Sequence, residues 1–267
     1  MQGNKTEMAH FAALAKSWWN PRGPQRILHK MNNMRMDFIN STLGPSITDP
    51  NQNTSKLTVL DIGCGGGLLS ESLARRHYVQ SVLGIDVTPE VLAVANNHKL
   101  VDPKLTNLKY ELRSVMDLES VKQSAEKPTF DIVTMFEVLE HLDDPKEALK
   151  LAMSKSSQYV FLSTINRTLA AYISTIALGE YVLNIVPPGT HTWSKYINAT
   201  ELESYVLGSG VNSESIWDVE KLQGCIYLPG TGWMRFDDQS KSGIEQLLNK
   251  VIGTDNGNYL MALKRRC

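Results

Sequence analysis

A buried-strand pattern that runs directly into a cluster of glycines constrains this chain more than any other feature. Residues 57–62 read Leu-Thr-Val-Leu-Asp-Ile, and glycines follow at positions 63, 65, 66 and 67. Such an apolar run is typical of a strand buried in a parallel sheet. Glycine adopts positive φ and lets a ligand approach the backbone closely. The sequence therefore predicts a strand, then a tight turn that no side chain crowds, with a polar ligand held against it.

Strand and helix patterns alternate after this turn. Strands separated by helices indicate an α/β fold with a mostly parallel sheet and helices on both faces. A Gly-, Pro- and aromatic-rich stretch at 224–239 predicts a loop or hairpin. The expected strands cover 57–62, 81–86, 108–112, 130–135, 159–163, 215–220 and 259–264, and the expected helices cover 68–76, 89–99, 137–142 and 145–154.

A polar loop at 44–56 separates this region from an N-terminal helical segment at 7–43, which is interrupted around Trp18–Gly23. We therefore expect an N-terminal helical extension over residues 1–50, and a main domain over 51–267.

The composition excludes some functions. Lys and Arg number 27 against 28 Asp and Glu, which gives a net charge of −1. A general nucleic-acid binder is usually more basic, so no nucleic-acid partner is expected. Three cysteines without metal-ligand spacing argue against a disulfide framework and indicate a reducing compartment.

Acidic residues at the ends of two expected strands limit which ligands could bind at the glycine turn. Asp61 precedes the turn, and Asp86 ends the next strand, close to the position of a ribose-binding acid. A dinucleotide and S-adenosylmethionine (SAM) both fit. However, Leu68 replaces the third glycine of the dinucleotide fingerprint. Asp61 suits a sulfonium with an amino group better than a pyrophosphate. A structural turn without a ligand is the remaining alternative.

An acidic cluster follows the fourth expected strand. On a helix, Glu137, Glu140 and His141 would share one face. Two carboxylates and an imidazole could bind Mg²⁺, and the histidine also admits Zn²⁺ or Mn²⁺. The alternative is that the glutamates favour the first turn of a helix through its dipole, beside a structural histidine.

Several motifs together resemble class I SAM-dependent methyltransferases, whose sheet is Rossmann-like. More closely, the chain resembles the ubiquinone-biosynthesis O-methyltransferases of bacteria and mitochondria. The resemblance covers residues 7 to about 220. It is carried by Val-Leu-Asp-Ile-Gly-Cys-Gly-Gly-Gly at 59–67, Gly-Ile-Asp at 84–86, Phe-Glu-Val-Leu-Glu-His-Leu-Asp-Asp-Pro at 136–145, Ser-Trp-Trp-Asn at 17–20, Leu-His-Lys-Met-Asn at 28–32 with Arg35, and Val-Pro-Pro-Gly-Thr-His at 186–191.

The resemblance implies roles for particular residues. Contacts to SAM would come from Arg35, Gly63, Gly65, Asp86 and Phe136, with Arg35 binding the methionine carboxylate. Glu137, Glu140 and His141 would hold a divalent metal, with Mg²⁺ favoured. The acceptor would be a polyprenylated catechol or a related phenol. The competing hypotheses are a nicotinamide-dependent oxidoreductase and a non-catalytic subunit of the same fold.

For the other candidate site residues, the sequence allows two interpretations each. Trp18 and Trp19 either pack the N-terminal helix on the core or cover the cofactor. His191 is a candidate general base or a structural histidine. Asp117 either contacts the adenine or caps a helix.

The apolar segment 168–186 is either a surface-bound helix that admits a lipid-soluble substrate or a buried helix. The family implies a peripheral place on the matrix side of the mitochondrial inner membrane, and a possible multi-enzyme coenzyme Q complex. A bacterial member would instead be cytoplasmic and membrane-associated.

Overall fold

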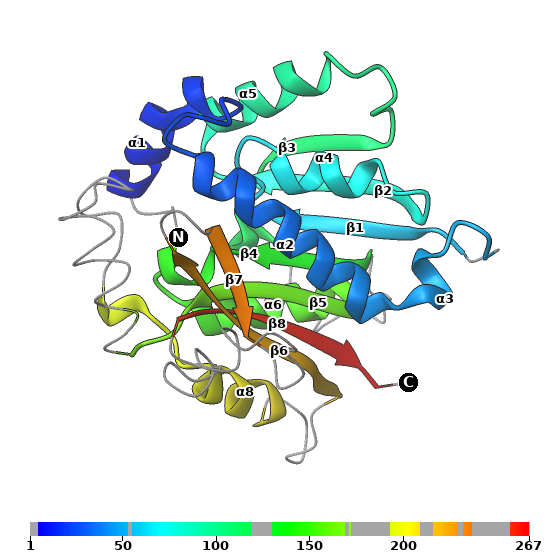
Figure 1. Cartoon of the computed structure of the whole chain (residues 1–267). Helices are drawn as coiled ribbons and strands as arrows, with labels where there is room; N and C mark the ends of the chain where they lie inside the picture. Colours follow the sequence, from blue (N-terminus) through cyan, green and yellow to red (C-terminus); the bar gives the residue numbers. More distant parts are fainter. Residues whose placement is uncertain are drawn as a thin grey trace. The chain divides into compact units, whose positions relative to one another are not determined.

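The computed structural model (Figure 1) describes residues 5–52, 55–118, 130–168, 171, 193–208, 216–228, 232–236 and 257–266. The chain divides into two compact units, Met1–Phe161 and Leu162–Arg266. The division falls inside strand β5 (Ser156–Ile165). The domain boundary expected near residue 50 is a different division and stays a prediction.

Parallel pairing characterises the sheet of the first unit. Its strand order is β3-β2-β1-β4-β5, and β1 pairs in parallel with both β2 and β4, as β2 does with β3. Val59 and Leu60 on β1 are both completely buried. Because neighbouring residues on a strand point to opposite faces, both faces of β1 are covered. The strands are β1 Leu57–Ile62, β2 Val79–Asp86, β3 Leu108–Leu112 and β4 Phe130–Phe136.

The helices of the first unit begin where the sequence provides turn and capping residues. The left-handed Gly67 precedes α4, and prolines occupy the first turns of α5 and α6. Asp144 caps α6 by accepting the Glu147 N–H at 3.0 Å. The α-helices are α1 Lys5–Leu14, α2 Arg26–Leu43, α3 Pro45–Thr48, α4 Leu68–Ala74, α5 Pro89–Lys99 and α6 Pro145–Lys155, and the 3₁₀ helices are η1 Ala15–Ser17, η2 Val115–Asp117 and η4 Leu139–His141.

Helix α2 is anchored to the rest of the first unit by its buried face. The Asn32 amide donates to Leu68 O at 3.3 Å and to Ser72 Oγ at 2.9 Å, which ties α2 to α4. The completely buried ring of Phe38 meets Phe161 edge to face at 6.1 Å. Together, these contacts explain why an N-terminal helix is part of the core of this unit.

A single carboxylate joins the beginnings of three strands. Asp131 at the start of β4 accepts both the N–H and the hydroxyl of Thr58 at 2.8 Å, the Ser157 hydroxyl at 3.2 Å and the Gln158 amide at 3.1 Å. Burial alone would raise the pKa of Asp131, but these hydrogen bonds outweigh it and hold the pKa below its usual value. Asp131 therefore fastens β1, β4 and β5 at their amino ends.

The second unit has antiparallel strands. β6 (Trp217–Leu228) pairs with β7 (Gly232–Phe236) on one side and with β8 (Asn258–Arg265) on the other. An irregularity interrupts the β6–β8 register between Val219 and Lys221. The β6–β7 pair confirms the hairpin alternative predicted within 224–239. Helical segments of this unit are η6 (Trp193–Lys195) and α8 (Ala199–Gly208).

Most predicted elements are confirmed with bounds shifted by a few residues, although β6 continues to Leu228 and does not end near residue 220. The helix predicted over 137–142 is wrong. β4 ends at Phe136, and Glu137 takes a positive φ of 55°. Only the single 3₁₀ turn Leu139–His141 follows, and Leu142 is already extended. Asp144 and Pro145 begin the next helix so soon that no room remains for a nucleated α-helix.

Within the described ranges, no helix combines the length and the apolar character required to cross a bilayer. The apolar segment 168–186 lies almost entirely outside the described residues.

Candidate functional site

A pocket lies at the carboxyl ends of the parallel strands of the first unit. Its empty volume of about 650 Å³ includes the open mouth. Open α/β sheets bind ligands at this edge. Three predicted residues line it, namely Gly63, Asp86 and His141. The lining also contains Arg113 and Asp143, which the sequence analysis did not single out.

The turn after β1 is fixed by its own backbone. Gly63, Gly65 and Gly67 have φ of 69°, 52° and 91°, so the predicted positive φ is confirmed for these three glycines but not for Gly66. The N–H groups of Gly63 and Cys64 donate to Ile85 O at 2.9 and 3.1 Å, and the Gly67 N–H donates to Cys64 O at 3.0 Å. These bonds hold the turn against the end of β2.

Side chains of the chain itself face the bare sides of these glycines. A Cβ on Gly63 would lie 2.4 Å from Val138 Cγ2. A Cβ on Gly65 or Gly66 would lie 2.5 Å or 2.3 Å from the Trp18 indole. The expectation that no side chain crowds the turn is therefore wrong. Close approach of Trp18 is itself a reason for glycine at 65 and 66.

Asp86 ends β2 and points its carboxylate into the turn. Its Oδ2 accepts the Gly65 N–H at 2.9 Å, and its Oδ1 accepts the Thr88 N–H at 2.8 Å. Burial raises the pKa of this carboxyl, although the backbone hydrogen bonds oppose the shift. A carboxylate accepts up to about four hydrogen bonds, and the predicted contact of Asp86 with a ribose stays a prediction.

Asp61 lies deeper than Asp86. It is 3% exposed and accepts the hydroxyl of Ser70 and, at 2.7 Å, that of Thr134. Burial raises its pKa, while these two hydroxyls and the charge of Arg35 oppose the shift. Asp61 thus joins β1, α4 and β4, and its predicted contact with a cofactor stays a prediction.

Arg35 and Phe136 are brought together from distant parts of the sequence. The guanidinium carbon of Arg35 on α2 lies 5.3 Å from the Phe136 ring centroid at the end of β4, within the range of a cation–π contact. Arg35 Nη2 also donates to Met31 Sδ at 3.4 Å. Both residues are buried. Their predicted contacts with SAM are untested by this geometry.

The acid–histidine cluster lies in an irregular turn instead of on one helix face. Glu137 has a left-handed backbone, Glu140 is 4% exposed, and His141 lines the pocket. The His141 ring meets Phe11 of α1 edge to face at 5.4 Å. In the part of the chain that the structure describes, no three His, Cys, Asp or Glu side chains are grouped to hold a metal ion. The divalent metal expected at Glu137, Glu140 and His141 therefore stays a prediction.

Two further candidates are placed differently. Asp117 belongs to a capping box at η2 and accepts the Ser114 N–H at 3.2 Å, so it caps this turn. Its predicted contact with the adenine stays a prediction. His191 lies outside the described residues.

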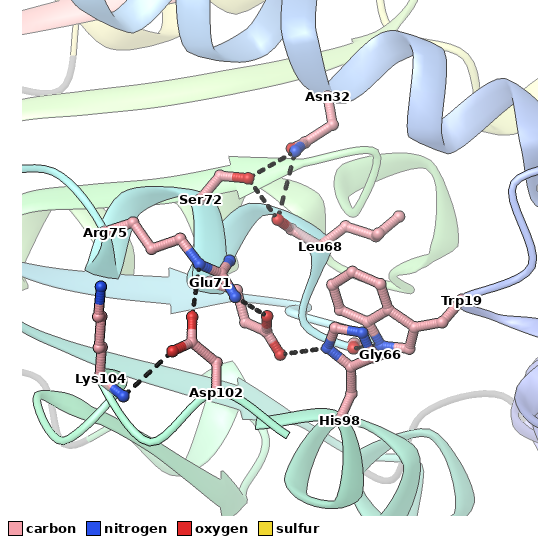
Figure 2. Close-up of polar contacts among 10 residues, drawn as sticks. All are labelled: Trp19, Asn32, Gly66, Leu68, Glu71, Ser72, Arg75, His98, Asp102 and Lys104. Carbon is pink, nitrogen blue, oxygen red and sulfur yellow. Dashed lines mark hydrogen bonds and ion pairs between the residues drawn. The ribbon is translucent and has the colours of Figure 1, made fainter. Parts of the chain in front are cut away.

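A cluster around Trp19 was missed by the sequence analysis (Figure 2). The Trp19 indole N–H donates to Gly66 O at 2.9 Å. The ring stacks on His98 of α5, with centroids 3.4 Å apart and planes 2° from parallel. His98 Nδ1 lies 2.8 Å from Glu71 Oε1. The adjacent tryptophans before a helix break were the available signal, but nothing in the sequence showed their partners.

Glu71 is the buried end of this cluster. Its side chain is fully buried and also accepts from Arg75 at 2.8 Å, and Arg75 continues to Asp102 at 3.0 Å. A buried carboxylate is stable only when paired in this way. The glycine turn, α4 and α5 are therefore linked through polar side chains.

Comparison with known proteins identifies the fold first. The family model "Methyltransferase domain" matches residues 27–215. The structure is similar to that of the Synechocystis magnesium protoporphyrin IX methyltransferase with bound SAH, with a TM-score of 0.61 over 96% of this chain and 94% of that one. Their sequences are only 14% identical, so this likeness shows the fold alone. Fold and family match together define a Rossmann-like methyltransferase domain.

Relatives then define the family. The chain is 41% identical to the mitochondrial ubiquinone biosynthesis O-methyltransferase of Candida albicans, over 98% of this chain and 85% of the relative. It is 36% identical to the Saccharomyces cerevisiae protein of the same name, over 98% and 88%. A Coxiella burnetii relative is 38% identical, over 78% and 82%. This chain belongs to the ubiquinone biosynthesis O-methyltransferase family.

Proposed function

We propose that this chain transfers the methyl group of SAM to a hydroxyl of a polyprenylated catechol or related phenol in ubiquinone biosynthesis. The observation that carries the proposal is the 41% identity over 98% of the chain to a ubiquinone biosynthesis O-methyltransferase. The pocket supports it, because Gly63 and Asp86 lie at the edge of the sheet where an adenosyl cofactor binds.

When bound, SAM supplies an electrophilic methyl on a positive sulfur: the C–S bond breaks as the new C–O bond forms, and the hydroxyl proton leaves. The chain's main task is alignment of an in-line displacement. Asp86 accepts from the ribose hydroxyls, the glycine turn lies along the cofactor backbone, and Arg35 pairs with the methionine carboxylate.

The acceptor hydroxyl must lose its proton, and a phenol has a pKa of about 10. His191 is the candidate base, because an imidazole can take up a proton near neutral pH. His191→Ala should lower kcat and change its pH dependence. A wild-type pH profile of kcat in this variant rejects the role.

Divalent-metal assistance through Glu137, Glu140 and His141 is part of the proposal, with Mg²⁺ ahead of Zn²⁺ and Mn²⁺. The family resemblance supports it, whereas the described geometry gathers no ligand set. The test is methyl transfer after chelation and after adding back each ion. Full activity in chelated protein contradicts the metal role.

The site of action is also proposed, namely the matrix side of the mitochondrial inner membrane, with a possible coenzyme Q enzyme complex. The names of several relatives include "mitochondrial". Liposome flotation of wild type against Ile173→Glu/Ile176→Glu tests whether segment 168–186 binds lipid. Equal flotation of the two proteins rejects the membrane role.

The deciding experiment combines calorimetry and catalysis. We expect wild type to bind SAH but not NAD, and to methylate a prenylated catechol. Binding of NAD would favour the oxidoreductase hypothesis. Binding of SAH without turnover on any catechol, with or without Mg²⁺, would favour a non-catalytic subunit.

A further inference from the structure

Two strong hydrogen bonds from outside the turn hold the backbone of Gly65 and Gly66. Gly65 and Gly66 have no side chains, and glycine loses more conformational freedom on folding than other residues. Asp86 holds the N–H of Gly65 at 2.9 Å on one side. On the other side, the indole N–H of Trp19 holds the carbonyl of Gly66 at 2.9 Å. The two hydrogen bonds therefore hold the amide of Gly65 and the carbonyl of Gly66 on opposite sides of the turn.

Trp19 is itself held firmly. Its ring stacks on His98 at 3.4 Å with planes only 2° from parallel, so the indole cannot tilt without losing that contact. His98 is in turn fixed at 2.8 Å by the fully buried Glu71, which belongs to the helix that begins directly after the turn. Figure 2 shows Trp19, His98 and Glu71 in series beside Gly66.

We propose that Trp19 is a positioning residue for the methyl donor, because its indole N–H fixes the Gly66 peptide in the conformation that the cofactor contacts. This inference rests on the proposed binding of SAM at the turn. Trp19 does not touch the reacting atoms. It acts from the N-terminal segment, through the turn, on the affinity for the donor.

The neighbouring Trp18 has a different task. Its indole fills the space beside Gly65 and Gly66, and it belongs to an apolar cluster with Ala15, Leu68 and Val91. Apolar packing of this kind stabilises the fold without orienting a peptide group. The hydrogen bond of Trp19 supplies the directional constraint.

The test is a pair of matched donor deletions. Trp19→Phe keeps an aromatic ring for His98 and removes the N–H, together with part of the packing of the indole on the cluster around Trp18. Tyr78→Phe likewise removes one donor, from the hydrogen bond between Tyr78 Oη and Asn40 Oδ1 at 2.6 Å. Tyr78 directly precedes β2, at the opposite end of that strand from Asp86.

We expect Trp19→Phe to raise the Kd for SAH, measured by calorimetry, about 3- to 10-fold, as the loss of one hydrogen bond predicts. The KM for SAM should rise equally, while kcat at saturating SAM stays unchanged. Tyr78→Phe should lower the unfolding midpoint by a similar amount to Trp19→Phe and leave the Kd for SAH at the wild-type value.

Two outcomes overturn the inference: wild-type SAH affinity in Trp19→Phe, or an equal loss of affinity in both variants, which would reflect general destabilisation. Wild-type protein that binds no SAH would instead reject the proposed function.

Discussion

The pKa values of aspartates are shifted in opposite directions at the two ends of the parallel strands. At the amino ends, Asp131 is saturated by hydrogen bonds, and its pKa is lowered. At the carboxyl ends, burial raises the pKa values of Asp61 and Asp86. A buried carboxylate with a raised pKa costs stability in its charged form. From this difference in pKa we expect Asp131 to contribute mainly to stability and Asp86 to contribute mainly to binding.

Loss of Asp86 should give the largest effect at the binding end. Asp86→Ala removes two charge-assisted acceptors for ribose, each worth about 1.5–3 kcal/mol, so the Kd for SAH should rise by about 100-fold or more. Isothermal titration calorimetry measures it. The matched control is Asp49→Ala, whose carboxylate only accepts from Asn51 at the surface. A change below about 3-fold in Asp86→Ala would remove the ribose role.

Loss of Asp131 should show the opposite pattern. Asp131→Ala deletes the hydrogen bonds to Thr58, Ser157 and Gln158 and should lower the free energy of unfolding by about 2 kcal/mol. The Kd for SAH should stay at the wild-type value. Urea unfolding and calorimetry on the same sample check both. Weakened SAH binding in proportion to the lost stability would break the distinction between the ends.

Backbone strain after β4 gives a third test at the binding end. Glu137 is the one non-glycine residue of the described chain with a positive φ, at 55°. Glu137→Gly should therefore raise the free energy of unfolding by about 1 kcal/mol while methyl transfer falls. Glu147→Gly, in the first turn of α6, should lower stability by about the same amount. If Glu137→Gly also destabilises, the turn is not strained.

The smallest expected effect concerns pH: the contributions of Asp131 and Asp86 to the free energy of unfolding should change with pH in opposite directions. For Asp131, whose folded pKa is lowered, the stabilising contribution is complete above the unfolded pKa of about 3.9 and is lost as pH falls through the lower folded value. For Asp86, whose folded pKa is raised, the folded state binds the extra proton, so its contribution falls as pH rises through that window.

Unfolding free energies between pH 3 and 7 separate the two behaviours, as differences between wild type and each Asp→Asn variant. The advantage of wild type over Asp131→Asn should shrink toward low pH. Relative to Asp86→Asn, wild type should lose stability toward neutral pH. Slopes of the same sign in both differences would contradict the comparison.

Local patterns predicted the strands and the position of the turn well. Leu57–Ile62 and Leu108–Leu112 were predicted with the observed bounds, because their apolar residues and flanking turn residues are adjacent in sequence. The position of Asp86 at the edge of the pocket was predicted because the carboxyl ends of parallel strands meet at one edge of a sheet. The helix over 137–142 failed because helical spacing says nothing about the left-handed φ of Glu137.

Long-range contacts could not be predicted. Trp19 meets Gly66 and His98 across large separations in the chain, and no periodicity encodes such a pairing. Glu71 was not singled out in the sequence, although its side chain is fully buried and contacts both His98 and Arg75. The crowding of Gly65 and Gly66 by Trp18 likewise depends on how α1 and η1 fold back.

The close approach of Trp18 and Trp19 to the glycine turn also has a spectroscopic consequence. Trp18 is 6% exposed, and Trp19 is stacked on an imidazole. Because both indoles contact Gly65 or Gly66, we expect their fluorescence emission to depend on the conformation of the glycine turn. The chain holds five tryptophans in total. Single Trp→Phe replacements therefore assign any change in emission on adding SAH to one indole. Intrinsic tryptophan fluorescence could then follow cofactor binding without an added label.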